Sequence, residues 1–324
     1  MSTIKHDTLT FKPAWWLRNP HLQTLFPVIC KRHIKNLKLA RERLELPDAD
    51  FIDLDYTQDD DRPIVLILHG LEGSISSHYA KGMLQAIHRN GWRGVFMHFR
   101  GCSGEHNRLP IAYHSGETED LAYVVNLLHQ RFPLQPIAAI GFSLGANMLL
   151  KWLGETGQHN ILCASVAVST PFELEKCVTK ISTGFSRIYQ QHLLSALRRK
   201  MQDKFELTPS SIPLPDFRQL HSLYDFDNYV TAPLHGFADA KEYYTQSSSR
   251  QFLRAIDVPT LLLQAKDDPF VPFDALPLAT ELSGKIQLEL VEKGGHVGFI
   301  SGNFPGRPHY WLEERIPEFL KNFL

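Results

Sequence analysis

The sequence predicts an α/β fold with a mostly parallel β-sheet that is covered by helices on both faces. From about residue 50 onward, short and continuously apolar segments alternate with segments of helical periodicity. Continuous apolar runs indicate strands buried on both faces, and strand–helix alternation is typical of parallel sheets. The alternation is interrupted at about 171–250 by a polar segment with a mostly helical pattern. Because a structureless loop of that length is uncommon, we expect a helical cap over one end of the sheet.

The individual elements follow from their periodicity. Residues 51–56 alternate apolar and polar side chains, which indicates a half-buried edge strand, whereas residues 64–68 are continuously apolar. The predicted strands are 51–56, 64–68, 94–99, 137–140, 161–168, 260–264 and 286–291. The predicted helices outside the cap are 79–87, 117–128, 144–153 and 310–324. We therefore expect an N-terminal segment, 1–49, packed on an α/β domain at 50–324.

The composition excludes several classes of protein. The chain of 324 residues has 34 basic and 35 acidic side chains, so it lacks the basic excess of a general nucleic-acid binder. No secretory signal and no apolar run of about 20 residues is present, so we expect a cytoplasmic protein. The cysteines form no CxxC pair, and neither HExxH nor a His/Cys cluster suggests a metal site. Those cysteines are Cys30, Cys102, Cys163 and Cys177.

The N-terminal segment has one feature that could attract a membrane. Trp15 and Trp16 precede a run of basic residues, and anionic lipid surfaces attract such runs. The basic residues are Lys31, Arg32, Lys35, Lys38, Arg41 and Arg43. The alternative is a solvated basic face with both tryptophans packed on the core. We expect membrane association to be absent, or weak and peripheral.

The motif G-F-S-L-G at 141–145 is the main functional signal. A predicted strand precedes it and a predicted helix follows it, which is the setting of a nucleophile elbow that presents Ser143 on a sharp turn. The alternative is an ordinary glycine-rich turn with an uninvolved serine. A serine hydroxyl is a poor nucleophile at neutral pH, so this prediction also requires a base.

A base and an acid are expected at the same edge of the sheet. Asp267 and Asp268 follow the predicted strand 260–264, and His296 follows the predicted strand 286–291. Because the carboxyl ends of parallel strands meet at one edge, these residues can approach Ser143. We favour Asp268 as the acid because it begins a D-x-x-V-P sequence. Asp267 stays open as the alternative, and either carboxylate could instead cap local amides.

Ester chemistry also requires amides that stabilise the oxyanion of the tetrahedral intermediate. The Leu144 amide follows the expected nucleophile. The second donor is expected from the segment H-G-L-E-G at 69–73, where we choose the Leu71 amide. A further glycine-rich turn, R-G-C-S-G at 100–104, should lie beside the same edge. We expect it to support the structure, with substrate contact as the alternative.

The sequence lacks the motifs of nucleotide-binding sites and of hydrolases that use an aspartate nucleophile. No GxxxxGK[ST] indicates a P-loop, and no GxGxxG follows the first predicted strand. Dehalogenases and epoxide hydrolases would carry aspartate in place of Ser143.

Over about residues 50–324 the sequence resembles the α/β-hydrolase superfamily of serine hydrolases, and within it the bacterial YheT-like esterase group. The narrower likeness is carried by PHLQT at 20–24, HGLEGS at 69–74, RGCSG at 100–104 and GFSLGAN at 141–147. The resemblance implies an α/β-hydrolase fold, with Ser143, Asp268 and His296 as the catalytic triad. Eukaryotic relatives of this group resemble carboxylesterases and acylglycerol or phospholipid lipases that are often membrane-anchored, and no such anchor is predicted here.

The predicted function is a serine carboxylesterase that hydrolyses short- to medium-chain acyl esters through an acyl-enzyme. Ser143, His296 and Asp268 would form the triad, with the Leu71 and Leu144 amides as the oxyanion hole. No cofactor is required, and the expected partner is a small acyl ester. The alternatives are an acylglycerol lipase, a thioesterase or an acyltransferase that uses the same triad, and a non-catalytic scaffold that binds an apolar ligand.

Overall fold

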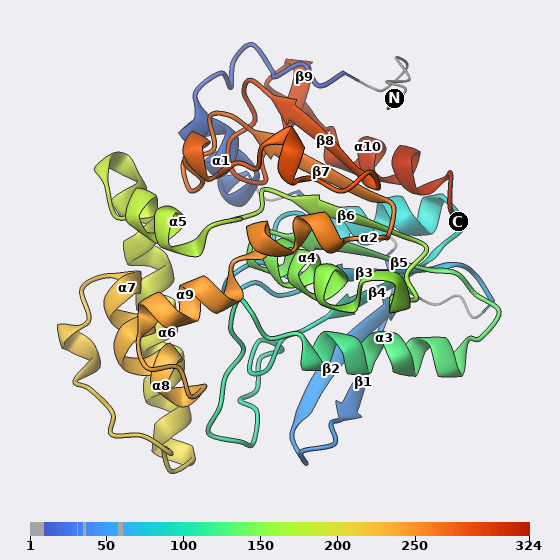
Figure 1. Ribbon diagram of the computed structural model, residues 1–324. Helices are drawn as coiled ribbons and strands as arrows, with labels where there is room; N and C mark the ends of the chain where they lie inside the picture. The colour runs from blue at the N-terminus through green and yellow to red at the C-terminus, as the bar shows by residue number, and fades with distance from the viewer. Residues whose placement is uncertain (1–9, 31, 35–36, 58–60) are drawn as a thin grey trace.

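The fold centres on one mixed β-sheet, seen in a computed structural model that describes residues 10–30, 32–34, 37–57 and 61–324 (Figure 1). Within these residues the sheet has eight strands in the order β1-β2-β4-β3-β5-β6-β7-β8. Strands β3 to β8 run parallel to one another, and β2 pairs antiparallel with both of its neighbours, β1 and β4. The strands are β1 (Leu39–Glu45), β2 (Phe51–Thr57), β3 (Ile64–Leu68), β4 (Arg93–Met97), β5 (Ile137–Phe142), β6 (Ala164–Val168), β7 (Thr260–Ala265) and β8 (Ile286–Val291). This arrangement confirms the predicted fold class.

Helices cover both faces of the sheet because its parallel strands are apolar on both sides. Alternate strand residues point to opposite faces: Val65 and Ile67 pack with the helices α2 and α10, whereas Leu66 and Leu68 pack with α3 and α4. The helices outside the cap are α1 (Pro20–Ile29), α2 (Ala80–Arg89), α3 (Glu119–Arg131), α4 (Leu144–Thr156) and α10 (Leu312–Leu320). A small hairpin of β9 (Ile300–Phe304) and β10 (Arg307–Tyr310), which the sequence did not predict, precedes α10.

The antiparallel edge of the sheet differs from the prediction. β2 is not a half-buried edge strand: all seven of its residues are buried, because β1 lies outside it as the edge. Burial of Asp53 and Asp55 is tolerated because Arg43 and Arg41 of β1 bind them, with Nε–Oδ1 distances of 3.0 and 2.7 Å. The sheet therefore begins before residue 50, the boundary predicted for the α/β domain.

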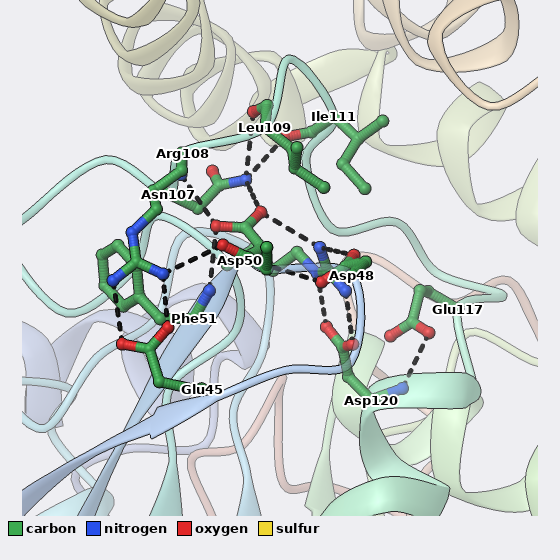
Figure 2. A network of polar contacts seen from close by, with 12 residues as sticks. Glu45, Asp48, Asp50, Phe51, Asn107, Arg108, Leu109, Ile111, Glu117 and Asp120 are labelled. Atoms are coloured by element: carbon green, nitrogen blue, oxygen red, sulfur yellow. Dashed lines mark hydrogen bonds and ion pairs between the residues drawn. The ribbon is translucent and has the colours of Figure 1, made fainter.

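Arg100, the first residue of the turn at 100–104, belongs to a largely buried ion-pair network, and Figure 2 shows its partners Asp48, Asp50 and Asp120. The Arg100 guanidinium donates two hydrogen bonds of 2.7 Å to Asp120 and also contacts Asp48 and Asp50, at 2.6 and 3.0 Å. Asn107 Nδ2 donates to the same Asp50 carboxylate at 2.7 Å. These contacts fix the loops that follow β1 and β4 to the start of α3. They give Arg100 the structural role that the sequence favoured.

The segment predicted as a cap contains five α-helices, which Figure 1 shows gathered on the left, beside one end of the sheet. They are α5 (Leu174–Ile181), α6 (Arg187–Leu207), α7 (Leu223–Phe226), α8 (Ala232–Leu234) and α9 (Ala240–Ser247). They have an apolar cluster of their own, which includes Leu194, Leu197 and Phe226. Asn147 of α4 joins the end of α9 to the core, because its Nδ2 donates to the carbonyls of Ser115 and Ser247.

Three residues of the N-terminal basic run form ion pairs, although Lys38, Arg41 and Arg43 are exposed. Arg41 and Arg43 belong to β1 and bind buried aspartates, while Arg32 binds Glu313 of α10. Lys31 and Lys35 lie outside the described residues. Trp15 is 63% exposed, and Trp16 packs edge-on against Phe26. In the described part of the chain, no helix combines the length and apolar character that crossing a membrane requires.

Candidate active site

Ser143 occupies a strained turn between β5 and α4. Its backbone has φ +52° and ψ −118°, a conformation that costs free energy for a non-glycine residue and is concentrated at functional sites. The two flanking glycines are required for space. A Cβ at Gly141 would lie 2.6 Å from the Cα of Ala146, and one at Gly145 would lie 2.5 Å from the carbonyl oxygen of His69. The motif therefore forms the sharp turn that the sequence predicts.

His296 lies between Ser143 and Asp268, so the structure brings these three predicted residues together. His296 Nε2 is 2.9 Å from Ser143 Oγ, and His296 Nδ1 is 2.9 and 3.1 Å from the two carboxylate oxygens of Asp268. A carboxylate can only accept, so Nδ1 carries a proton and Nε2 is free to accept from the serine hydroxyl. The ring of Phe270 stacks on the imidazole with a centroid distance of 4.1 Å.

The two adjacent aspartates have different partners. Asp268 is buried, and besides His296 it accepts hydrogen bonds from the amides of Phe270 and Val271. Asp267 Oδ1 instead accepts from the amides of Gly294 and Gly295, at 2.9 and 3.0 Å. Burial raises the pKa of Asp267. Asp268 therefore contacts the imidazole, whereas Asp267 binds the backbone of the two glycines that precede His296.

Helix α1 supports the histidine loop, a contact that the sequence analysis missed. The His296 amide donates to Thr24 Oγ1 at 2.9 Å, and the side-chain amide of Gln23 bonds both the N–H and the C=O of Ile300. A Cβ at Gly295 would lie 2.6 Å from the Pro20 carbonyl oxygen, so the loop and the helix touch closely. The motif PHLQT at 20–24 was the available signal, but nothing in it indicates a partner more than 270 residues away.

Residues 69–73, which we call the oxyanion loop, are fixed by hydrogen bonds. The Phe99 amide donates to His69 Nε2, so His69 Nδ1 is protonated and donates to the Gly70 carbonyl at 2.7 Å. Burial lowers the pKa of His69 to about 3, which keeps the ring neutral. The Gly70 amide donates to Tyr79 Oη, and the Gly73 amide donates to the Gly70 carbonyl.

The amides of Leu71 and Leu144 remain available in this arrangement. Neither donates a hydrogen bond to another residue in the described part of the chain. The oxyanion loop also lies close to the serine, since a Cβ at Gly70 would be 3.1 Å from Ser143 Cβ. Two unused N–H groups beside one hydroxyl match the requirement of an oxyanion hole.

A cavity of about 950 Å³ opens onto Ser143, His296 and Leu71. Its walls come from the oxyanion loop, α1 and the cap. Among the apolar residues that the cap contributes are Leu174, Val178, Ile181, Leu193, Leu197 and Met201. The size and the apolar lining are typical of sites that bind small organic molecules.

Comparison with known proteins identifies the family. A profile described as "alpha/beta hydrolase fold" matches residues 63–303. The chain is 42% identical to "Putative esterase YheT" of Escherichia coli strain K12, over 97% of this chain and 94% of that one. It is 28% identical to "Phospholipase ABHD3" of Bos taurus, covering 94% and 76%, and 32% identical to "Monoacylglycerol lipase" of Saccharomyces cerevisiae, covering 82% and 60%.

Solved structures show the same fold. The esterase Pf2001 of Pyrococcus furiosus superposes with a TM-score of 0.56 at 18% identity, over 99% of each chain. The family match and the E. coli relative confirm the predicted resemblance and the prediction of a hydrolase. The chain belongs to the α/β-hydrolase family.

Proposed function

We propose that the protein is a serine esterase that hydrolyses carboxylic esters. Ser143 Oγ attacks the acyl carbonyl while His296 Nε2 takes the hydroxyl proton, and the Leu71 and Leu144 amides stabilise the oxyanion. The imidazolium then gives its proton to the departing alcohol, which leaves an acyl-enzyme on Ser143. Water releases the acid by the same route, with His296 again acting as base and then as acid. Asp268 orients the ring and stabilises its charged form.

The observation that carries this proposal is the unbroken hydrogen-bonded series from Asp268 through His296 to Ser143, which ends at an apolar cavity. A hydroxyl that donates to a neutral imidazole is activated as a nucleophile, and a cavity beside it admits the substrate. The alternative of a non-catalytic scaffold would leave these groups without a function.

The substrate we propose is a small ester with an apolar acyl chain. Short- to medium-chain acyl groups were expected from the sequence, and a cavity of about 950 Å³ also has space for longer chains. Lipase activity on acylglycerols is the second candidate, supported by this volume and by the relatives that are named for phospholipase and monoacylglycerol lipase activity. A panel of p-nitrophenyl esters and monoacylglycerols of graded chain length distinguishes the two.

Substitution of Ser143 tests the proposal. Ser143→Ala should lower kcat for p-nitrophenyl butyrate by about 10⁴-fold or more, because it removes the nucleophile. The same change should abolish labelling by a fluorophosphonate probe. Ser195→Ala is the matched control, since Ser195 is exposed on α6 and, among the described residues, its hydroxyl bonds only to the Gln191 carbonyl. Activity retained in folded Ser143→Ala would contradict the proposal.

A further inference from the structure

The cap contacts the oxyanion loop through a partly buried ion pair. Lys200 of α6 donates from Nζ to Glu72 Oε1 at 2.7 Å, and its Nζ lies 3.1 Å from Cys102 Sγ. The Lys200 and Glu72 side chains are 14% and 12% exposed. A charged hydrogen bond that is shielded from water holds its partners in a defined geometry more strongly than one on the surface.

Glu72 is also held by Tyr113. The Glu72 amide donates to Tyr113 Oη at 2.7 Å, and that hydroxyl donates back to Glu72 Oε1 at 2.8 Å. Burial, together with the charge of Glu72, raises the pKa of Tyr113 well above its usual value, so the hydroxyl keeps its proton. Glu72 has φ +52°, a conformation that needs such support in a non-glycine residue.

The position of Glu72 in the chain links this ion pair to the proposed chemistry. Glu72 directly follows Leu71, whose amide is the proposed second oxyanion donor. The Leu71 side chain packs against both the sheet core and the cap cluster. Lys200 therefore reaches from the cap to the residue next to that amide.

Lys200 is charged in this environment. Burial alone would lower its pKa, but Cys102 and Glu72 outweigh burial and raise it. Loss of the ammonium would leave the Glu72 carboxylate, which is only 12% exposed, without its charged partner, and among the described residues the Tyr113 hydroxyl would still donate to it. Movement of such a carboxylate toward water lowers its free energy, and this movement would displace the neighbouring peptide as well.

We propose that Lys200 is a positioning residue for the oxyanion loop: it fixes Glu72, and through Glu72 the Leu71 amide, so that the docked cap sets the reactivity of Ser143. This inference rests on the proposed esterase function. In it the cap has a second role besides lining the cavity, because the oxyanion hole is complete only when α6 lies against the loop.

The main test is Lys200→Met, which keeps the length of the side chain and removes its charge. A displaced oxyanion donor weakens the transition state more than the bound substrate, so kcat/KM for p-nitrophenyl butyrate should fall about 10- to 100-fold. KM should change by less than about threefold. A trifluoromethyl ketone, which adds Ser143 Oγ to its carbonyl and forms an oxyanion, should lose affinity by the same factor as kcat/KM.

Lys204→Met is the matched control on the same helix, one turn further on. Lys204 is buried and, like Lys200, joins α6 to the core, but its Nζ bonds Asn107, at 2.6 Å to Oδ1 and 3.1 Å to the carbonyl oxygen. Asn107 belongs to the network of Figure 2 and not to the oxyanion loop. This variant should lower stability while kcat/KM stays within about threefold of the wild type.

Glu72→Gln keeps the test decisive if Lys200→Met does not fold, because it is isosteric and removes the other charge. It should lower kcat/KM in the same direction, and the double variant should lose no more than Lys200→Met alone, since both changes break one interaction. Unchanged kcat/KM in both single variants would overturn the proposal, as would an equal loss in Lys204→Met. Ser143→Ala separates the two ideas: if that variant stays active, the esterase function itself fails.

Discussion

Two histidine–aspartate pairs with nearly equal N–O distances occur in the described part of the chain. His296 lies 2.9 Å from Asp268, and His98 lies 2.8 Å from Asp55, with all four side chains buried. The pairs differ in what the second imidazole nitrogen faces. In His296 it faces the Ser143 hydroxyl at 2.9 Å, and in His98 it faces the Cys102 carbonyl oxygen at 3.3 Å.

This difference shows that a His–Asp pair alone does not define an active site. A carbonyl oxygen has no proton to give and cannot become a nucleophile, whereas a hydroxyl can do both. His296 also lines the cavity, whereas His98 does not belong to the cavity lining in the described part of the chain. The His98 pair instead secures β2, because Arg41 of β1 binds the same Asp55.

Equivalent substitutions in the two pairs should have opposite consequences. His296→Ala should lower kcat/KM by about 10⁴-fold or more, because no base remains for Ser143, with little change in stability. His98→Ala should keep kcat/KM within about threefold but lower the free energy of unfolding by about 2 kcal/mol, because it removes a buried partner of Asp55. Ester hydrolysis and urea denaturation measure the two effects. Loss of activity in a folded His98→Ala protein would remove the distinction between the pairs.

The adjacent aspartates provide a finer comparison within one turn. Asp268→Asn should lower kcat by about 10³- to 10⁴-fold, because an amide no longer holds the imidazole in the required tautomer. Asp267→Asn should stay within about threefold of the wild type, because its amide oxygen can still accept from Gly294 and Gly295. Steady-state measurement of kcat for the two isosteric variants shows which aspartate acts on the imidazole. Equal losses would mean that the loop contact matters as much as the imidazole contact.

The smallest expected effect is the pH dependence of the structural pair. Burial opposes ionisation of Asp55, but hydrogen bonds from Arg41 and His98 outweigh it and hold its pKa well below the usual range. The stability it contributes is thus fully present above the unfolded-state pKa of about 4 and is lost as the pH falls below that value. Asp55→Asn should cost about 1–3 kcal/mol at pH 7, a difference that shrinks below pH 4. A gap that is constant from pH 7 to pH 3 would contradict this explanation.

The sequence predicted the residues around Ser143 because each of them follows an apolar strand. β3, β5, β7 and β8 are clear from their composition, and the chain order then places Ser143, Asp268 and His296 at one edge. The contacts that support these site residues could not be predicted, because they join segments that are distant in the sequence. Thr24 supports His296 from 272 residues away in the sequence, and Glu72 binds Lys200 of the cap from 128 residues away.

β1 was missed for a related reason. Its sequence, L-A-R-E-R-L-E, resembles a charged surface segment, and among its seven residues only Leu44 is buried. Its arginines are explained by Asp53 and Asp55 on β2, whose burial was in turn concealed by an alternating pattern. The arginines of β1 and the buried aspartates of β2 are explained only by their pairing, so neither strand could be assigned correctly from its own sequence.

The support of the histidine loop by α1 has a practical consequence for protein engineering. A shortened version that begins at residue 31 would retain the nucleophile, the base, the acid and both oxyanion amides. It would nevertheless lose the hydroxyl and the side-chain amide that brace the loop carrying the base, at Thr24 and Gln23. Purification tags, fusions and domain trimming should therefore spare α1, although none of the proposed reacting groups lies in this helix.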